Sequence, residues 1–427
     1  MAVRFASKYH MPFASNISKI MSDRQVFLTI PELLPTVNSA MHPTSKSASF
    51  SGHTFRACMA GHHFYKIMLS KHVIFPGVVG LALGTFHAIL LKQDGSVWIS
   101  AGALRKNFVQ KIPSGATAVA GGTNFSIVLK QDRYVWVTGH NSKGQLGDGT
   151  TTSKGSFFFV RMIDSANTVA VGSQHSMILT QRGVVWVAGW NKYGQLGDGS
   201  TCGSTSFLVA ISSRVKAMTA GDVHSIVLKQ DGSVWAAGRN YNGQLGDGTK
   251  EDRKRFTLVM PNGAASVTAG GYHSMVLKQD GSVWGTGFNA YGQLGDGSTI
   301  DSTNYIQVMS SGARGGVKTI VAGSRHSMVL KQDSSVWATG HNELGQLGDG
   351  SIINKHIFKQ VIASGVQVVA AGHFHSMVAK EDGSIWATGS NEYDQFGDPS
   401  ISSKKFFVRL TPFNNGSKSN KQLRYSG

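Results

Sequence analysis

Residues 269–287 read Ala-Gly-Gly-Tyr-His-Ser-Met-Val-Leu-Lys-Gln-Asp-Gly-Ser-Val-Trp-Gly-Thr-Gly, and the spacing within this stretch recurs along the chain. A Gly is followed by a His three residues later and by a Trp eleven residues after the His. Six copies keep all three residues, and in one further copy Phe replaces His. The triples are Gly84/His87/Trp98, Gly122/Phe125/Trp136, Gly172/His175/Trp186, Gly221/His224/Trp235, Gly270/His273/Trp284, Gly323/His326/Trp337 and Gly372/His375/Trp386. A period near fifty residues with fixed internal spacing indicates one supersecondary module per copy, as in propellers and solenoids.

A second motif, Gly-Gln-Leu-Gly-Asp-Gly in its commonest form, follows the Trp in six copies. Its Asp always lies twelve residues after the Trp, at Asp148, Asp198, Asp247, Asp296, Asp349 and Asp398. We interpret the motif as turn chemistry, in which Gly supplies positive φ, Leu points inward and Asp hydrogen-bonds its own backbone. One acid per loop gives too few oxygens for calcium.

Each copy has the pattern of four short strands. Two β-rich runs flank Asp280-Gly281, which predicts a hairpin with a type I′ turn. At Asp132-Arg133 and Asp333-Ser334 a non-Gly residue takes the place of Gly and is expected to carry strain. A run such as 119–120 precedes the hairpin, and a run such as 256–259 ends the unit.

The hairpin strands are apolar on both faces, so each sheet must be covered on both sides. The sequence therefore predicts an all-β fold, a seven-bladed β-propeller of four-stranded antiparallel blades. The seven repeated Trp residues are expected in equivalent buried positions. The first copy is expected to be irregular, because it lacks the Gly-Gln-Leu-Gly-Asp-Gly loop after Trp98.

Charge divides the chain into three parts. The formal net charge is +18, and residues 1–76 and 401–427 together carry two thirds of the excess. We expect a basic, largely irregular N-terminal extension over 1–76 with an extra strand near 62–69, a ring over 77–412, and a flexible basic tail over 413–427. Basic ends suggest a polyanionic partner such as chromatin or nucleic acid, although they also suit a merely solubilising tail.

Several function classes find no support in the sequence. Cys58 and Cys202 suggest neither a disulfide framework nor a zinc site, and no apolar run is long enough to span a membrane. We expect a monomer in the cytoplasm or nucleus that is not secreted and has no membrane contact. No nucleophile elbow, phosphate loop or paired carboxylates occur, so no catalytic residue, cofactor or metal is expected.

The full repeat, Ala-Gly-x-x-His-Ser-φ-φ-Leu-Lys-x-Asp-Gly-Ser-Val-Trp-x-x-Gly-x-Asn-x-x-Gly-Gln-Leu-Gly-Asp-Gly with φ apolar, stands almost unaltered at 220–248, 269–297 and 322–350. It resembles the regulator of chromosome condensation family, and the resemblance covers about residues 77–412. The family includes an exchange factor for a Ran-type GTPase, ubiquitin-ligase modules, an ultraviolet-B photoreceptor and many adaptors. The resemblance therefore implies the fold more than one function.

The repeated His has a structural interpretation. A propeller does not carry six equivalent active sites, so we expect each ring to bind backbone carbonyls of the neighbouring loop. Repeated Lys residues two positions before the hairpin Asp are expected to form a solvated, locally neutralised opposite face.

Positions that vary between near-identical repeats are better candidates for function. The first–second and third–fourth loops of a blade emerge on one face, and their variable positions carry the aromatic, Arg and His residues that dominate binding hot spots. The alternative is drift at exposed loop tips. The residues that we predict to bind a protein partner are Trp190, Asp222, Arg239, Tyr272, Phe288, Arg325, His341, His373 and Phe374.

The primary hypothesis is a non-catalytic protein-binding scaffold or adaptor that uses this rim. The alternative is guanine-nucleotide exchange on a Ran-type small GTPase, because residues 221–225 resemble exchange factors in placing an acid, Asp222, directly after the repeat Gly. The same resemblance implies that His373 corresponds to a functional His in a later blade of those exchange factors. An ordinary loop at 239–248 stands where the exchange factors carry an inserted β-wedge. The photoreceptor's Gly-Trp-Arg-His-Thr motif is matched only by Gly-Ser-Arg-His-Ser at 323–327.

Overall fold

The computed structural model describes residues 47–50, 53–58, 66–68, 77–101, 106–160, 165–312 and 316–410. The chain divides into two compact units, Met1–His72 and Val73–Gly427. The first contains one antiparallel sheet of β1 (Ser47–Phe50), β2 (His53–Cys58) and β3 (Lys66–Met68). The strand expected near 62–69 thus corresponds to β3, which pairs with β2. The tail expected over 413–427 lies outside the described residues.

The second unit consists of seven antiparallel sheets, each of four consecutive strands. Their bounds are β4 (Val78–Leu83), β5 (Ala88–Lys92), β6 (Val97–Ala101) and β7 (Lys106–Ile112) in blade 1; β8 (Ala116–Gly121), β9 (Phe125–Lys130), β10 (Val135–Gly139) and β11 (Lys154–Val160) in blade 2; β12 (Ala166–Val171), β13 (His175–Thr180), β14 (Val185–Gly189) and β15 (Ser204–Ile211) in blade 3; and β16 (Val215–Ala220), β17 (His224–Lys229), β18 (Val234–Gly238) and β19 (Arg253–Met260) in blade 4. The remaining blades are β20 (Ala264–Ala269), β21 (His273–Lys278), β22 (Val283–Gly287) and β23 (Ser302–Met309) in blade 5; β24 (Val317–Ala322), β25 (His326–Lys331), β26 (Val336–Gly340) and β27 (Lys355–Ile362) in blade 6; and β28 (Val366–Ala371), β29 (His375–Lys380), β30 (Ile385–Gly389) and β31 (Lys404–Arg409) in blade 7.

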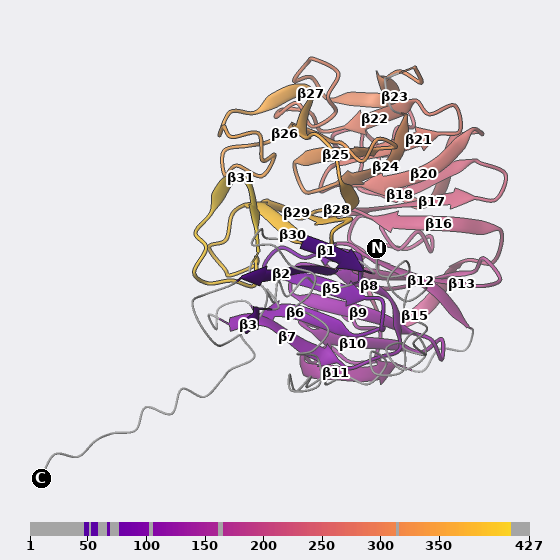
Figure 1. The fold of residues 1–427 in the computed structure, drawn as a ribbon. Helices are drawn as coiled ribbons and strands as arrows, with labels where there is room; N and C mark the ends of the chain where they lie inside the picture. The colour runs from indigo at the N-terminus through magenta and orange to yellow at the C-terminus, as the bar shows by residue number, and fades with distance from the viewer. Residues whose placement is uncertain are drawn as a thin grey trace, which may run out of the picture. The chain divides into compact units, whose positions relative to one another are not determined.

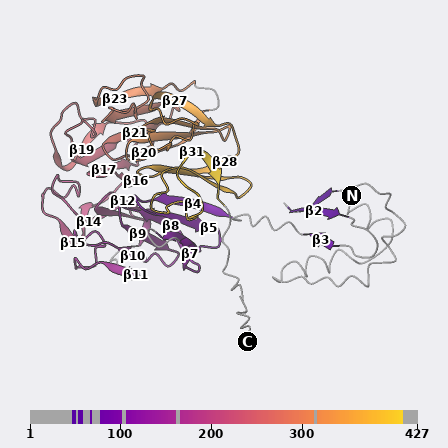
Figure 2. The same ribbon diagram turned by 90° about the vertical axis from the view of Figure 1, so that its left-hand side faces the viewer.

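The blades follow one another around a ring in chain order (Figure 1). The first strand of each blade contacts the first strand of the next, and β28 contacts β4, so blade 7 lies beside blade 1 (Figure 2). A shared apolar cluster closes the ring, with Phe108 and Leu90 from blade 1 packed against Phe396 and Leu410 from blade 7. The prediction of a seven-bladed β-propeller with four-stranded antiparallel blades is confirmed.

The prediction of type I′ hairpin turns is wrong. Only the Gly has positive φ, for example 83° at Gly281, and the adjacent Asp does not. The amide of Gly281 donates to the carbonyl of Lys278, and Lys278 N–H donates to Ser282, so the loop has three residues with a left-handed third position. Arg133 (φ 68°) and Ser334 (φ 62°) occupy that position without Gly, as expected.

The repeated His joins neighbouring blades, but it does so through Ser and not through the expected carbonyls. His175 Nε2 lies 2.9 Å from Ser225 Oγ of the next blade. Ser225 Oγ in turn donates to the carbonyl of Gln195 at 2.7 Å. Because a hydroxyl carries one proton, His175 must donate from Nε2, which leaves Nδ1 unprotonated. Nδ1 has no hydrogen-bond partner. A Cβ added at Gly172 would come within 2.6 Å of this Nδ1, which accounts for the repeat Gly.

We call the boundary between one blade and the next a seam. The His–Ser bond recurs at most seams. His224 bonds Ser274, His273 bonds Ser327, His326 bonds Ser376 and His87 bonds Ser126, all at 2.8–2.9 Å. At the seam between blades 7 and 1, Ala88 stands at the Ser position, and neither ring nitrogen of the fully buried His375 has a partner. Blade 2 has the fully buried Phe125 in place of the His. Five of the seven seams therefore carry the His–Ser bond.

The loop between the third and fourth strands is built around a buried Asn that sequence analysis did not single out. In blade 3, Asn191 Oδ1 accepts from Leu196 N–H, and Asn191 Nδ2 donates to Asp198 Oδ1. Asp198 also accepts from Ser200 N–H, which confirms the expected role of the Asp in holding its own backbone. Leu196 is fully buried, as the inward Leu was expected to be.

The repeated Trp residues occupy equivalent positions, but the expectation that they are buried is only half right. All seven are half-buried, and a Lys ammonium lies over the indole ring in six blades, as with Lys229 at 3.8 Å and Lys278 at 3.9 Å from the ring centroids. In five blades the indole N–H donates to the Ser two residues earlier, for example Trp284 to Ser282 at 2.9 Å, whereas Trp136 and Trp186 have no Ser there and no hydrogen-bond partner. The repeated Lys residues therefore stack on Trp, which corrects the expectation of a merely solvated face.

Candidate protein-binding face

The two variable loop classes lie on the same face because hydrogen bonds tie them together. The residue that begins each third–fourth loop donates its N–H to the carbonyl of the residue just before the repeat His or Phe. The pairs are His140 with Asn124, Trp190 with Gln174, Arg239 with Val223, Phe288 with Tyr272, His341 with Arg325 and Ser390 with Phe374, at 2.8–3.0 Å. The nine residues predicted to bind a partner therefore all belong to loops of one face, which we call the rim.

An Arg at the centre of aromatic rings organises the rim over blades 3 to 5. The guanidinium of Arg239 lies 4.9 Å from the ring centroid of Tyr193, 5.7 Å from Tyr241 and 5.8 Å from Tyr272. Trp190 packs edge-on against Tyr193, with centroids 5.4 Å apart. These five residues form the Arg239 cluster. Stacking orients the guanidinium without neutralising it, so the cluster keeps a positive charge.

A second cluster spans blades 5 and 6 around Tyr291. Arg325 lies over the Tyr291 ring at 5.3 Å, and its Nη1 donates to the Tyr291 hydroxyl at 3.2 Å. Phe288 and His341 pack edge-on against the same ring, at 5.9 and 4.7 Å. His341 is 5% exposed and hydrogen-bonds Gln346, so it belongs to the loop interior and offers little surface.

Two predicted residues from non-adjacent blades meet in the central channel. His373 Nε2 of blade 7 lies 3.3 Å from Asp222 Oδ1 of blade 4. Both line a cavity of about 260 Å³ formed by the inner strands and first loops of the seven blades. Burial favours the neutral form of Asp222, but the hydrogen bond to His373 together with the imidazoles of His373, His224 and His175 outweighs it, and the pKa of the carboxyl is lowered. Phe374 packs edge-on against the His373 ring of this pair, with ring centroids 5.6 Å apart.

Burial of the rim differs from the sequence expectation. None of the nine residues is exposed, because neighbouring loops stack on them. The third–fourth loops expose Ile300, Ile352 and Ile353, and at the two positions after the repeat Asn the large side chains that face solvent are Tyr241 (67% exposed), Leu344 and Tyr393. The last three and the two Tyr residues of the clusters, Tyr193 and Tyr291, were missed. The signal was present, since the two positions after the repeat Asn also vary between otherwise similar repeats.

Comparison with known proteins agrees with this architecture. Models of the regulator of chromosome condensation (RCC1) repeat match residues 116–145, 167–195, 215–244, 264–293, 317–346 and 366–395, and a second model of the same repeat matches 182–228, 231–277 and 280–330. The chain belongs to the RCC1-repeat family. No curated protein matches it significantly.

Solved structures similar to this RCC1-repeat protein share its fold. Human WBSCR16 aligns with a TM-score of 0.63 at 20% identity, over 77% of this chain and 90% of that one. Yeast RCC1 (Prp20), in a complex with Kap60, aligns with a TM-score of 0.66 at 17% identity, over 73% and 81%. Prp20p from Saccharomyces cerevisiae, described together with its binding to Gsp1p and histones, aligns with a TM-score of 0.61 at 19% identity, over 72% and 84%.

No helix that could cross a membrane is found among the residues that the structure describes.

Proposed function

We propose that this RCC1-repeat propeller is a non-catalytic scaffold that binds a protein partner through its rim. The observation that carries the proposal is the Arg239 cluster together with the exposed Tyr241. Aromatic rings and a guanidinium held by stacking lose little side-chain entropy on binding, and such residues dominate hot spots. The retained charge of Arg239 and Arg325 favours a partner with acidic groups at the contact.

The test compares one exposed Tyr on each face. Tyr241→Ala is expected to weaken binding of a partner captured by the full chain by about 1–3 kcal/mol, because a rim anchor is lost. Tyr134, which is 47% exposed and follows the hairpin turn of blade 2 on the opposite face, supplies the matched control. Tyr134→Ala is expected to leave affinity unchanged by titration calorimetry. Equal losses for both variants, or a loss for Tyr134→Ala alone, would contradict the proposal.

Exchange on a Ran-type GTPase is a second candidate, supported by the Asp222–His373 pair. A carboxylate held at a channel mouth suits repulsion of a nucleotide phosphate, as in the family's exchange factors. The rim loop at 239–252 has the ordinary length, which weighs against it. If the protein is an exchange factor, labelled GDP leaves the GTPase faster in its presence, Asp222→Asn abolishes the effect and Asp280→Asn on the hairpin face does not. A wild-type chain without any acceleration excludes this function.

The basic ends remain a predicted polyanion-binding element. Residues 1–46 and 411–427, which include most of these Lys and Arg residues, lie outside the described ranges.

A further inference from the structure

Blade 1 lacks the long third–fourth loop that every other blade packs against the blade after it. In blades 2 to 7 the third and fourth strands are joined by 14 residues, whereas only residues 102–105 join β6 to β7 in blade 1. The difference matters to blade 2, because each long loop packs against the blade that follows its own.

A complete seam shows what the long loop provides. In blade 2, the Gln145 carbonyl accepts from Ser176 of blade 3, and Gly149 N–H donates to the carbonyl of Thr205 in the outer strand β15 at 2.8 Å. Leu146 is fully buried in the seam. Gly147 lies so close to Phe207 that a Cβ would come within 2.2 Å of the ring.

The same set of contacts recurs at the later seams. The loop Gly residues 197, 246, 295, 348 and 397 lie against Phe256, Tyr305, Phe358, Phe407 and Phe108 of the following blades, at 2.3–2.6 Å from an added Cβ. Leu196, Leu245, Leu294, Leu347 and Phe396 are buried at 0–1% exposure.

At the seam between blades 1 and 2, blade 2 has the residues that would contact a long loop, but blade 1 has no long loop. By strand register, Ser126, Gly155 and Phe157 correspond to Ser176, Thr205 and Phe207. In the described part of the chain, Ser126 Oγ has His87 as its partner at 2.9 Å and donates to no Gln carbonyl. No described residue donates to the Gly155 carbonyl in the manner of Gly149. Among the residues that the structure describes, the apolar cluster of this seam contains no loop Leu; Leu104 of the short connection lies outside them.

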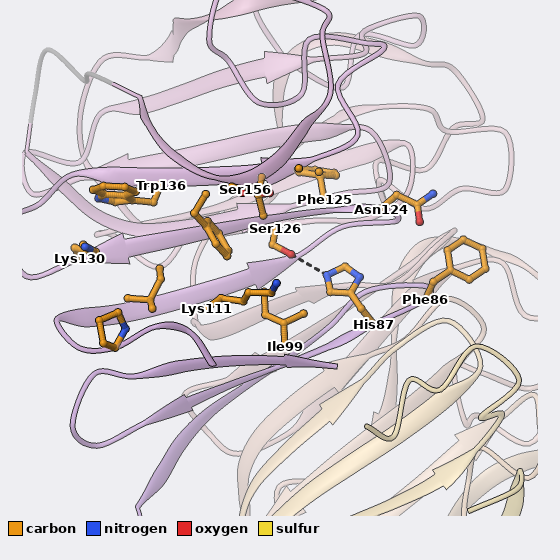
Figure 3. Close-up of a pocket in the computed structure, with 16 residues that line it drawn as sticks. Phe86, His87, Ile99, Lys111, Asn124, Phe125, Ser126, Lys130, Trp136 and Ser156 are labelled. Atoms are coloured by element: carbon orange, nitrogen blue, oxygen red, sulfur yellow. Dashed lines mark hydrogen bonds between the residues drawn. The ribbon is translucent and has the colours of Figure 1, made fainter. Parts of the chain in front are cut away.

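A cavity of about 530 Å³ lies at this position. Figure 3 shows it between Trp136 and Lys130 at one end and Phe86 and Asn124 at the other, with the His87–Ser126 bond on its wall. Gly155, Ser156 and Phe157 of β11 also line it. Its volume falls in the range of sites that enclose a ligand, and the outer strand adds an unpaired backbone edge.

We propose that this cavity binds a loop of a partner protein with Gly-Gln-Leu-Gly-Asp chemistry. The partner's Leu would fill the apolar seam, a carbonyl would accept from Ser126, and an amide would donate to the Gly155 carbonyl. Lys111 and Lys130 at the cavity favour an acidic loop over a basic one. The basic terminal segments of this chain are therefore poor occupants. The site lies away from the Arg239 cluster and does not depend on the proposed rim function.

The probe is a cyclised peptide with the sequence of residues 287–301, which carries one complete loop of this protein. It is expected to bind the full-length chain with 1:1 stoichiometry by calorimetry, and the same peptide with Leu294→Asp is expected to bind about tenfold more weakly or worse. In the protein, Gly155→Trp is expected to abolish binding and Gly155→Ser to preserve it. An added Cβ at Gly155 meets no atom within 4 Å, so neither variant is expected to unfold the chain.

A graft of residues 190–203 in place of 102–105 supplies the decisive comparison. The grafted chain is expected to melt at a higher temperature and to bind no peptide, because its own loop fills the seam. Absence of peptide binding to the wild-type chain, or undiminished binding to the grafted chain, overturns the proposal. Two further outcomes also overturn it: tighter peptide binding after deletion of 411–427, which makes the tail the occupant, and a wild-type dimer that the graft dissociates, which makes the occupant a second copy.

Discussion

Each repeat His is held neutral by its place between two blades. In five of the six, Nε2–H donates to a Ser hydroxyl, and in all six Nδ1 faces the repeat Gly and burial removes the water that would solvate an imidazolium. Burial lowers the pKa to about 4 for His87, His175 and His273, and to about 3 for His224, His326 and His375. These residues are therefore structural elements whose protonation opposes folding.

The stability of the ring is expected to fall steeply in mild acid. The unfolded chain takes up protons on His near pH 6.5, whereas the folded chain does so only near pH 3–4. The contribution of the neutral, buried His residues to the free energy of unfolding is therefore fully present above about pH 6.5 and is lost as pH falls toward 4. The free energy of unfolding falls by up to about 1.4 kcal/mol per pH unit for each His. Urea unfolding at pH 7.5, 6 and 5 measures this slope. His224→Phe, which copies Phe125 of blade 2, should reduce it by one His; a flat profile would contradict the account.

At the scale of elements, the seam between blades is held by a relay that crosses three segments. A His of one blade donates to a Ser of the next, and this Ser donates to the Gln carbonyl of the loop inserted between them. All three groups are buried, so each is costly to leave unpaired. The relay also orders the loops that carry the rim, since each loop Gln precedes the buried Leu.

Removal of one Ser tests the relay. Ser225→Ala leaves His175 Nε2–H and the Gln195 carbonyl unpaired, and we expect a loss of about 2–4 kcal/mol in the free energy of unfolding. Ser126→Ala at the seam without a long loop affects only the His87 bond and should cost about half as much. Urea denaturation of the two variants gives the comparison. Equal losses would show that the Gln carbonyl contributes nothing.

The blade count could be predicted from sequence because the spacings between Gly, His, Trp and Asp are fixed within one supersecondary unit. The relay could not, because it joins residues about fifty positions apart, such as His175 and Ser225, whose contact depends on how blades pack. The turn type was mistaken because Asp-Gly suits both a two-residue and a three-residue hairpin loop. The rim face could be predicted from loop topology, but its burial could not, since Tyr193 covers Arg239 from a neighbouring blade.

At the scale of the whole molecule, the two proposed surfaces lie in different parts of the ring. The Arg239 and Tyr291 clusters occupy the rim of blades 3 to 6, and the cavity beside Ser126 occupies the seam between blades 1 and 2. Both surfaces arise where the chain departs from the repeat. The rim clusters arise because loop residues vary between blades, and the cavity arises because the third–fourth loop of blade 1 is ten residues shorter than the others. The repeated framework supplies rigidity, and its exceptions supply the surfaces that a partner can recognise.

The most direct test of the rim as the binding face is photo-crosslinking from one position on each face. Benzoylphenylalanine replaces Tyr241 on the rim or Tyr134 on the hairpin face, both of which are exposed aromatic positions in the native chain. We expect irradiation of cells or extracts to link a partner to the chain labelled at 241 and not to the chain labelled at 134. A partner linked from position 134 and never from 241 would contradict it.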